Sequence, residues 1–254
     1  METRTFDLLT PHAILGAIES AYGLRLNGVL SVYPSYVNRV FGLTTEDGKA
    51  FVAKFYRPGR WSEEAILEEH RFVCDCAEEE LPVAAPLANG EGSTLHTVSA
   101  EEGDLRERFA FALYPRKGGR SFDAESDEDW MRLGALVGRI HDVAVRSPAL
   151  HRLRCSPDAS TAQFLDELSR SGVVHPKCER DFFALAEEAL AAILPLFEGV
   201  SAQRIHGDCH RGNILDRPGE GLLVIDFDDM MSGPAVQDLW LLLPDRAAGA
   251  TGPA

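Results

Sequence analysis

Three polar residues near the end of the chain have the order that phosphoryl transfer requires. Asp208 is followed five positions later by Asn213, and Asp226 follows the next apolar run. In phosphoryl transfer, one carboxylate orients the attacking hydroxyl, while an amide and a second carboxylate hold magnesium on the phosphates. Magnesium binds few protein oxygens, so a sparse Asn and Asp pair suits it. The order predicts Asp208 as catalytic base and Asn213 and Asp226 as magnesium ligands, with Asp226 also a catalytic residue.

A hairpin is predicted to bring these side chains together. Residues 214–215 and 222–225 are apolar and indicate short buried strands, and Pro-Gly-Glu-Gly at 218–221 is typical of the turn between them. Strands joined by a tight turn have their ends close together. We therefore expect Asp208, Asn213 and Asp226 to converge at one end of the hairpin.

A zinc-dependent hydrolase is an alternative from another class of enzyme. Five side chains of this stretch could ligate zinc: His206, Asp208, His210, Asp226 and Asp228. A zinc site leaves Asn213 without a role, which favours phosphoryl transfer. In that case we expect His206 to hold the loop by hydrogen bonds and His210 to contact substrate or phosphate. Asp228 and Asp229 would brace the magnesium loop or pair with arginines.

The first quarter of the chain predicts a helix followed by three strands. Thr10 and Pro11 are typical of a helix start, and Gly23 of a helix end. Runs of β-type residues at 29–33, 37–43 and 50–56 are separated by turn residues and indicate strands linked by hairpins. Lys54 lies inside the third run. It is either an edge lysine that reaches solvent or a lysine that holds the phosphates of ATP.

A helix over residues 62–77 is predicted to supply a partner for Lys54. Ser62 is a favourable N-cap, and acidic residues fill the first turn. Glu69 has apolar residues three and four positions away on both sides and so points from the apolar face, whereas Glu68 has fewer such neighbours and is expected to be solvated. In kinases, a lysine of the third strand pairs with a helix glutamate. Glu69 is therefore the predicted partner.

Two motifs resemble a known group of phosphotransferases. Residues 206–215, His-Gly-Asp-Cys-His-Arg-Gly-Asn-Ile-Leu, and Asp-Phe-Asp-Asp at 226–229 resemble the aminoglycoside phosphotransferase/choline kinase superfamily of kinase-like folds. Three further stretches narrow the resemblance to the bacterial stress response kinase A family of Ser/Thr protein kinases: residues 35–40, 55–61 and 233–240. The resemblance covers roughly residues 5–243.

This resemblance implies a two-lobed, protein-kinase-like α+β fold with ATP and Mg²⁺ as cofactors. Residues 1–115 would form a small antiparallel β lobe that binds ATP, and residues 116–254 a mainly helical catalytic lobe. Ser35 and the neighbouring amides of its turn would cap the phosphates, because a Gly-x-Gly-x-x-Gly loop is absent between the first two strands. His141 and Asp238 would support the loop that carries Asp208. The implied acceptors are Ser and Thr side chains of proteins, including the chain itself.

The remaining sequence predicts a strand at 109–115, a loop at 116–120, and helices at 127–141 and 180–197, with no defined element at 145–180. Members of the family continue for several helices where residues 245–254 form a Gly/Ala/Pro-rich tail without helical periodicity. We therefore expect a truncated catalytic lobe and a lower stability than that of a complete relative. Two alternatives stay open: a kinase for small molecules of the aminoglycoside, choline or homoserine class, and a catalytically idle binding module.

Composition limits the partners and the compartment. The 254 residues carry a formal net charge of −15, which disfavours nucleic acid or an anionic membrane surface as the main partner. The chain has five cysteines, an odd number, and no Cys-x-x-Cys pair, which argues against a disulfide framework or a zinc ribbon. The sequence shows neither a secretory leader nor a run of about 18 apolar residues. We expect a soluble, cytoplasmic monomer.

Overall fold

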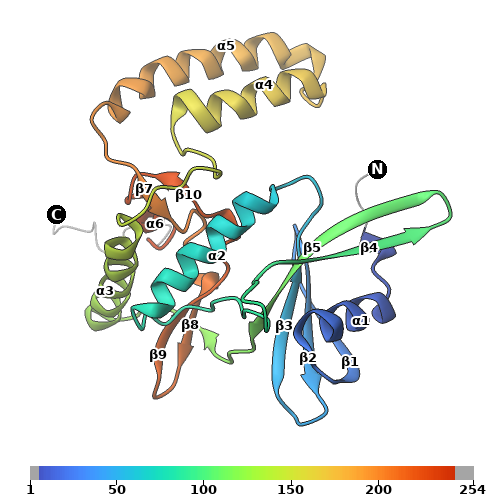
Figure 1. Cartoon of the computed structure of the whole chain (residues 1–254). Helices are drawn as coiled ribbons and strands as arrows, with labels where there is room; N and C mark the ends of the chain where they lie inside the picture. The colour runs from blue at the N-terminus through green and yellow to red at the C-terminus, as the bar shows by residue number, and fades with distance from the viewer. Residues whose placement is uncertain (1–5, 244–254) are drawn as a thin grey trace. The chain divides into compact units, whose positions relative to one another are not determined.

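The computed structural model describes residues 6–243 and consists of two compact units (Figure 1). Of the described residues, 6–122 and 215–226 form the first unit. Residues 123–214 and 227–243 form the second. The first unit is therefore built from two separate stretches of sequence.

A five-stranded antiparallel sheet forms the body of the first unit, in the order β1-β2-β3-β5-β4. Its strands are β1 (Leu26–Tyr33), β2 (Arg39–Thr45), β3 (Ala50–Phe55), β4 (His96–Glu102) and β5 (Leu105–Pro115). Lys54 of β3 pairs with Val40 of β2 on one side and Ala112 of β5 on the other. Because β3 is the central strand, the alternative of an edge lysine is wrong.

Helix α1 (Pro11–Tyr22) covers part of this sheet and has the predicted ends. The Thr10 hydroxyl accepts a hydrogen bond from the Ala13 N–H at 3.2 Å, and Gly23 ends the helix with a positive φ of 64°. The core between helix and sheet is aliphatic and aromatic, and includes Ile14, Ile18, Leu43, Phe55, Phe109, Phe111 and Leu113. Burial of each such side chain stabilises the fold by about 1.5–3 kcal/mol.

Helix α2 (Glu63–Glu78) begins as predicted, with the Ser62 hydroxyl accepting from the Ala65 N–H at 3.2 Å. Its buried face is wider than the apolar pattern indicates, since the buried residues between Ala65 and Cys76 fall on an arc of roughly 200° at 100° per residue. Glu68 lies at the edge of this arc and is 3% exposed, so the expectation that it is solvated is wrong. Glu69 is buried as well.

The predicted hairpin near the end of the chain is confirmed. Strands β8 (Ile214–Arg217) and β9 (Gly221–Val224) form a small sheet with β6 (Arg120–Ser121), in the order β6-β8-β9. Arg120 forms an ion pair with Asp216 at 2.8 Å. Val224 of β9 also pairs with Val83, which ties this hairpin to the chain after α2.

The second unit combines one buried helix with a two-stranded sheet. Helix α3 (Asp127–Ala144) begins with a capping box formed by Ser126 and Asp129, and buries Leu133, Leu136, Val137, Ile140 and Val143. Strands β7 (Gln203–Ile205) and β10 (Met231–Gly233) pair antiparallel, and α6 (Gln237–Trp240) follows. Arg204 of β7 is 1% exposed and donates to the carbonyls of Val143 and Ala144 at 3.0 and 3.2 Å. Its cation therefore satisfies the last turn of α3.

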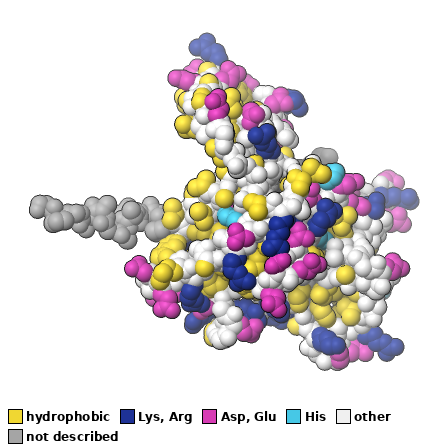
Figure 2. Space-filling model, turned by 60° about the vertical axis from the view of Figure 1, so that its left-hand side comes forward, with side chains coloured by type: hydrophobic (Ala, Val, Ile, Leu, Met, Phe, Trp, Pro, Cys, Tyr) yellow, Lys and Arg dark blue, Asp and Glu magenta, His cyan; other side chains and the backbone are white. Residues whose placement is uncertain are grey.

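Two further helices, α4 (Ala162–Ser171) and α5 (Pro176–Ile193), form an antiparallel pair in the second unit (Figure 1). The sequence predicted α5 but no helix at α4. None of the residues of these two helices is buried, and Figure 2 shows hydrophobic side chains on their surface. The exposed hydrophobic residues of these helices include Phe164, Phe182, Leu185 and Ile193.

The remaining predictions concern the membrane, the cysteines and the tail. Among the helices of residues 6–243, none is long and apolar enough to cross a membrane. The five cysteines are free thiols. The prediction for residues 245–254 lies outside the described part of the chain.

Candidate active site

The first unit brings together two of the predicted site residues. Lys54 Nζ lies 3.0 Å from Asp226 Oδ1, although the residues are 172 positions apart in sequence. The Lys54 side chain is 9% exposed and that of Asp226 is 56% exposed. The ammonium is therefore enclosed by the sheet, while the carboxylate reaches solvent. The Lys54 ammonium and the Asp226 carboxylate thus lie side by side near the end of β9.

Asp226 has an uncommon backbone conformation. Its φ is +60°, in the left-handed region that non-glycine residues seldom occupy and that Asp and Asn tolerate best. One residue, Ile225, separates Asp226 from the end of β9, and a short 3₁₀ turn, Phe227–Asp229, follows it. The reversed φ bends the chain at this carboxylate, and such conformations concentrate at functional sites.

The second unit holds Asp208 and Asn213 on one loop, residues 206–213, which we call the catalytic loop. The Asn213 side-chain N–H donates to the Asp208 carbonyl oxygen at 2.9 Å, and Asn213 is 8% exposed. Because the amide nitrogen makes this bond, the amide oxygen of Asn213 points away from the Asp208 carbonyl. The orientation of Asn213 is thus fixed by the residue that carries the predicted catalytic base.

The two histidines of the catalytic loop accept hydrogen bonds from its backbone. His206 Nδ1 accepts from the Asp208 N–H at 3.3 Å, as predicted for a loop-holding residue. His210 Nδ1 accepts from the Gly212 N–H at 2.9 Å, which places the ring hydrogen on Nε2, 3.5 Å from Asp208 Oδ2. His210 therefore orients toward the Asp208 carboxylate. Within residues 6–243 no group of three or more His, Cys, Asp and Glu side chains lies close enough together to hold a metal ion.

Asp238 of α6 anchors the start of the catalytic loop, as predicted. Its two carboxylate oxygens accept the N–H groups of His206 and Gly207, each at 2.9 Å. His141 Nε2 of α3 lies 2.9 Å from the same carboxylate, and Asp238 is 1% exposed. Hydrogen bonds to a buried charged group are among the stronger ones in proteins.

Two further features fix the catalytic loop. Gly207 has a φ of +84°, and a Cβ at this position would lie 2.0 Å from the Asp229 carbonyl oxygen. Cys209 is 2% exposed, and burial, with the carboxylates of Asp238 and Asp208 nearby, raises the pKa of its thiol. The thiol beside the predicted base is therefore neutral and part of the packing.

The remaining predicted nucleotide residues lie in the first unit. Ser35 belongs to the turn between β1 and β2, where its Oγ accepts from the Asn38 N–H at 3.3 Å. Glu69 lies on the buried face of α2 at 2% exposure. The pairing of Lys54 with Glu69 rather than Glu68 stays a prediction, and so does the contact of Ser35 with phosphate.

Two buried arginines of the second unit, Arg152 and Arg204, were not predicted from the sequence. Arg152 is 6% exposed and donates to the Asp228 carbonyl at 2.6 Å, next to the Asp226 segment of the chain. Arg204 holds β7, which leads directly into the catalytic loop, against the end of α3. Arg204 stands between Gln203 and Ile205 in a stretch where no strand is predicted, so its immediate sequence gives no signal of its burial.

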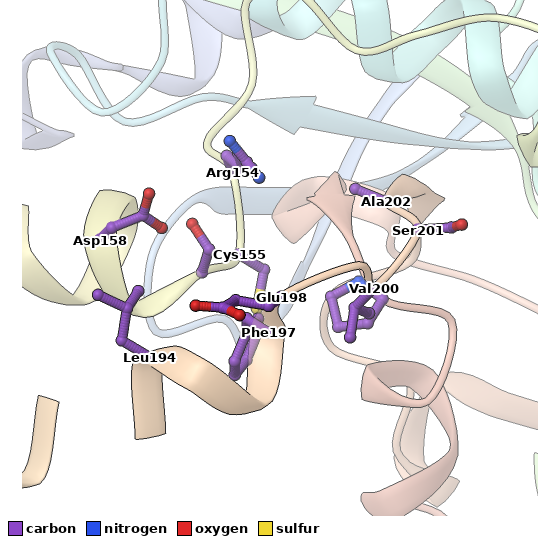
Figure 3. A pocket seen from close by; sticks show the side chains of 11 residues that line it. Arg154, Cys155, Asp158, Leu194, Phe197, Glu198, Val200, Ser201 and Ala202 are labelled. Atoms are coloured by element: carbon purple, nitrogen blue, oxygen red, sulfur yellow. The ribbon is translucent and has the colours of Figure 1, made fainter. Parts of the chain in front are cut away.

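A cavity of about 270 Å³ in the second unit lies apart from the catalytic loop (Figure 3). Ser201 and Ala202, which line it, precede β7, whereas Asp208 follows the opposite end of this strand. Figure 3 shows an apolar wall and a charged rim, formed by Leu194, Phe197, Val200, Arg154, Asp158 and Glu198. None of the predicted site residues lines this cavity.

Comparison with known proteins identifies relatives. Residues 30–253 match the model of the phosphotransferase enzyme family. Stress response kinase A of Salmonella paratyphi A is 38% identical over 250 residues, which cover 96% of this chain and 71% of the relative. A protein of Salmonella typhimurium named serine/threonine protein kinase RdoA is 37% identical over 245 residues, which cover 94% of this chain and 70% of that protein.

Solved structures share the fold. Amicoumacin kinase hAmiN, in complex with AMP-PNP, Ca²⁺ and Ami, superposes with a TM-score of 0.73 and 18% identity, covering 95% of this chain and 71% of that chain. This likeness confirms the predicted kinase-like α+β fold, with its antiparallel sheet followed by a helical region. By the match over residues 30–253 and the identity to stress response kinase A, the chain belongs to the phosphotransferase enzyme family, in the branch that contains the stress response kinases.

Proposed function

We propose that this chain is an ATP- and magnesium-dependent kinase that phosphorylates Ser and Thr side chains of proteins. The observation that carries the kinase assignment is the 3.0 Å contact of Lys54 with Asp226, which joins the lysine of the central strand to the aspartate after β9. The acceptor class rests on relatives at 37–38% identity, one of which is named a serine/threonine protein kinase.

Asp208 is the proposed base in the transfer step. The hydroxyl oxygen of the acceptor forms a bond to the γ-phosphorus, while the bond from this phosphorus to the bridging oxygen of ADP breaks. The bridging oxygen keeps the electron pair, and the hydroxyl proton passes to the Asp208 carboxylate. The Nε2–H of His210, 3.5 Å from Asp208 Oδ2, helps to hold that carboxylate in the direction of the acceptor.

Lys54 is the proposed phosphate ligand. An ammonium that is 9% exposed inside a sheet interacts strongly with phosphate oxygens because few water molecules screen it. Its ion pair with Asp226 keeps the side chain extended toward the end of β9 before nucleotide binds. Ser35 and the amides of its turn are the proposed ligands for the terminal phosphates.

The donor atoms present fit a magnesium ion. Asp226 offers a carboxylate that is 56% exposed, and Asn213 offers an amide oxygen whose direction is fixed by the bond of its nitrogen to Asp208. Hard oxygen ligands in small number are what magnesium prefers. Magnesium supplies charge neutralisation at the phosphates when bound. Asn213 and Asp226 would hold it.

The test is phosphoryl transfer from γ-labelled ATP with magnesium, with and without a generic Ser/Thr protein acceptor, beside the Asp208→Asn variant. We expect labelled phosphoserine or phosphothreonine in the acceptor, and a loss of about 100- to 10,000-fold in the variant. Asp216→Asn is the matched control, because Asp216 of β8 forms an ion pair with Arg120 of β6 and is not one of the proposed catalytic or ligand-binding residues. Turnover of the Asp208→Asn variant at the rate of the control would refute the assignment.

A kinase for small-molecule alcohols is the second candidate. It is favoured by the solved neighbours, whose names include amicoumacin kinase and an aminopropanol kinase at TM-scores of 0.73 and 0.64. At 18% identity these neighbours show the fold, whereas the relatives at 37–38% identity bear on the acceptor. Label that enters an aminoglycoside or amino alcohol, with none in protein, would decide for this candidate. Nucleotide binding without transfer to either would decide for an idle binding module.

A further inference from the structure

Arg57, which follows β3, holds the turn between β1 and β2 in one conformation. Its Nε donates to the Val37 carbonyl at 2.9 Å, and its Nη2 donates to the Tyr36 carbonyl at 3.1 Å. The backbone N–H of Arg57 donates to Oδ1 of Asn38 at 3.1 Å, and Asn38 is 4% exposed. A single residue thus contacts three consecutive residues of the turn that carries Ser35.

These contacts set the direction of the N–H groups in the turn. In a planar trans peptide, the C=O and the N–H point in opposite directions. Because the carbonyls of Tyr36 and Val37 point at the Arg57 guanidinium, the N–H groups of Val37 and Asn38 point away from it. The Asn38 N–H reaches Ser35 Oγ, which acts as an acceptor inside the turn and can donate its own hydrogen outward.

The turn therefore has hydrogen-bond donors on one side, as a site for an anion requires. Neighbouring backbone N–H groups on one side of a turn form a concave site for phosphate, and a Ser hydroxyl adds a further donor. The guanidinium on the other side of the turn binds the carbonyl oxygens, which carry the partial negative charge of the peptides, and so directs them away from that site. Tyr36, at the tip of the turn, is 100% exposed, so the turn faces solvent there.

We propose that Arg57 is a positioning residue that locks residues 34–38 in the form that receives the phosphates of ATP. This inference rests on the proposed function, because the anion is the nucleotide. A lysine cannot replace it: the rigid plane of the guanidinium presents Nε and Nη2 to two carbonyls at once, whereas lysine has a single nitrogen on a flexible stem. The effect is one of geometry, and charge alone does not reproduce it.

The first measurement is hydrogen exchange of the nucleotide-free chain, followed in peptides that cover residues 33–39. We expect the Asn38 amide, which donates to Ser35 Oγ, to exchange about tenfold faster or more in Arg57→Lys and in Arg57→Met, since each variant loses charge-assisted hydrogen bonds that hold the turn. Arg106→Met is the matched control, because this exposed arginine pairs with Glu101 on the β4–β5 hairpin. Exchange at the rate of the unaltered chain in Arg57→Lys would overturn the proposal, because charge would then suffice.

The second measurement compares the binding of ATP with that of adenosine. We expect both Arg57 variants to bind ATP with magnesium about tenfold more weakly and adenosine as well as the unaltered chain does. An equal loss for both ligands would overturn the phosphate role and leave Arg57 a general structural residue. If the unaltered chain bound no ATP, the proposed function would fail and the phosphate role with it, while the exchange data would still decide whether Arg57 fixes the turn.

Discussion

His141 and Asp238, which are 97 positions apart in sequence, meet at 2.9 Å beneath the catalytic loop. The same carboxylate accepts the N–H groups of His206 and Gly207, so helices α3 and α6 jointly fix the residues that precede Asp208. The position of the proposed base therefore depends on a carboxylate that is 1% exposed and lies outside the loop itself.

Asp238→Asn should loosen the catalytic loop. The amide would place an N–H group against one of the backbone N–H donors, and each unsatisfied buried group costs about 1–3 kcal/mol. We expect the free energy of unfolding to fall by about this amount, with faster hydrogen exchange across residues 205–213. Urea unfolding and exchange mass spectrometry measure the two effects. Asp158→Asn, at a carboxylate of the second unit away from the loop, serves as control, and equal exchange in both variants would contradict the anchoring role.

Lys54→Met should remove phosphate binding while keeping the fold. Methionine matches the apolar stem of lysine, and Asp226 at 56% exposure remains solvated without its partner. We expect kcat/KM for ATP to fall by about 100-fold or more with little change in the melting temperature. Lys49→Met is the control, since this lysine forms an exposed ion pair with Asp47. A similar loss of activity in the control would show that the effect is not specific to Lys54.

Gly207→Ala should destabilise the native conformation of the catalytic loop. An added Cβ would lie 2.0 Å from the Asp229 carbonyl oxygen, and the φ of +84° is strained for any residue with a side chain. We expect a loss of more than about 2 kcal/mol in the free energy of unfolding. Gly219→Ala is a matched control, with a φ of +82° but nothing within 4 Å of an added Cβ. Comparable unfolding curves for both variants would show that the close approach at Gly207 relaxes without cost.

The thiol of Cys209 should make the fold sensitive to alkaline pH. Burial raises its pKa in the folded chain above the ordinary value of 9.0, so the folded state keeps a proton that the unfolded state releases. Stability that is present below pH 9.0 is then lost as pH rises above it, by up to about 1.4 kcal/mol per pH unit. Urea unfolding between neutral pH and pH 10.5 measures the slope.

Substitution separates this contribution from that of other groups. Cys209→Ala should flatten the alkaline slope, whereas Cys178→Ala should leave it unchanged, because Cys178 is exposed. The pKa of Tyr22 is also raised by burial, to about 12, so some loss of stability above pH 10 should persist in both variants. Equal slopes for the two cysteine variants would refute the contribution of Cys209.

The helix ends and the polar residues of the catalytic loop could be predicted from the residue types alone. Thr10, Ser62 and Gly23 mark helix ends through their own side chains or backbone, and the polar residues of the catalytic loop interrupt apolar strands. The kinase-like fold and the anchoring by Asp238 and His141 were both implied by the resemblance to the family.

Burial that depends on distant segments was not predictable in the same way. Glu68 is buried because α2 is covered over a wider arc than its apolar residues mark. Arg57 and Arg204 contact partners 19 or more positions away, and nothing in their immediate sequence indicates these partners. Helix α4 was missed because Pro157 and Pro176, on either side of it, indicate chain breaks, and its amphipathic pattern is only ten residues long.

Because the first unit is built from two stretches of sequence, it cannot be produced as one continuous fragment. A fragment that ends at Phe122 lacks β8, β9 and Asp226, and with them the partners of Arg120, Val83 and Lys54. The first unit is therefore not a separable module: a break of the chain after residue 122 would leave Lys54 without Asp226, which lies in the second of the two stretches.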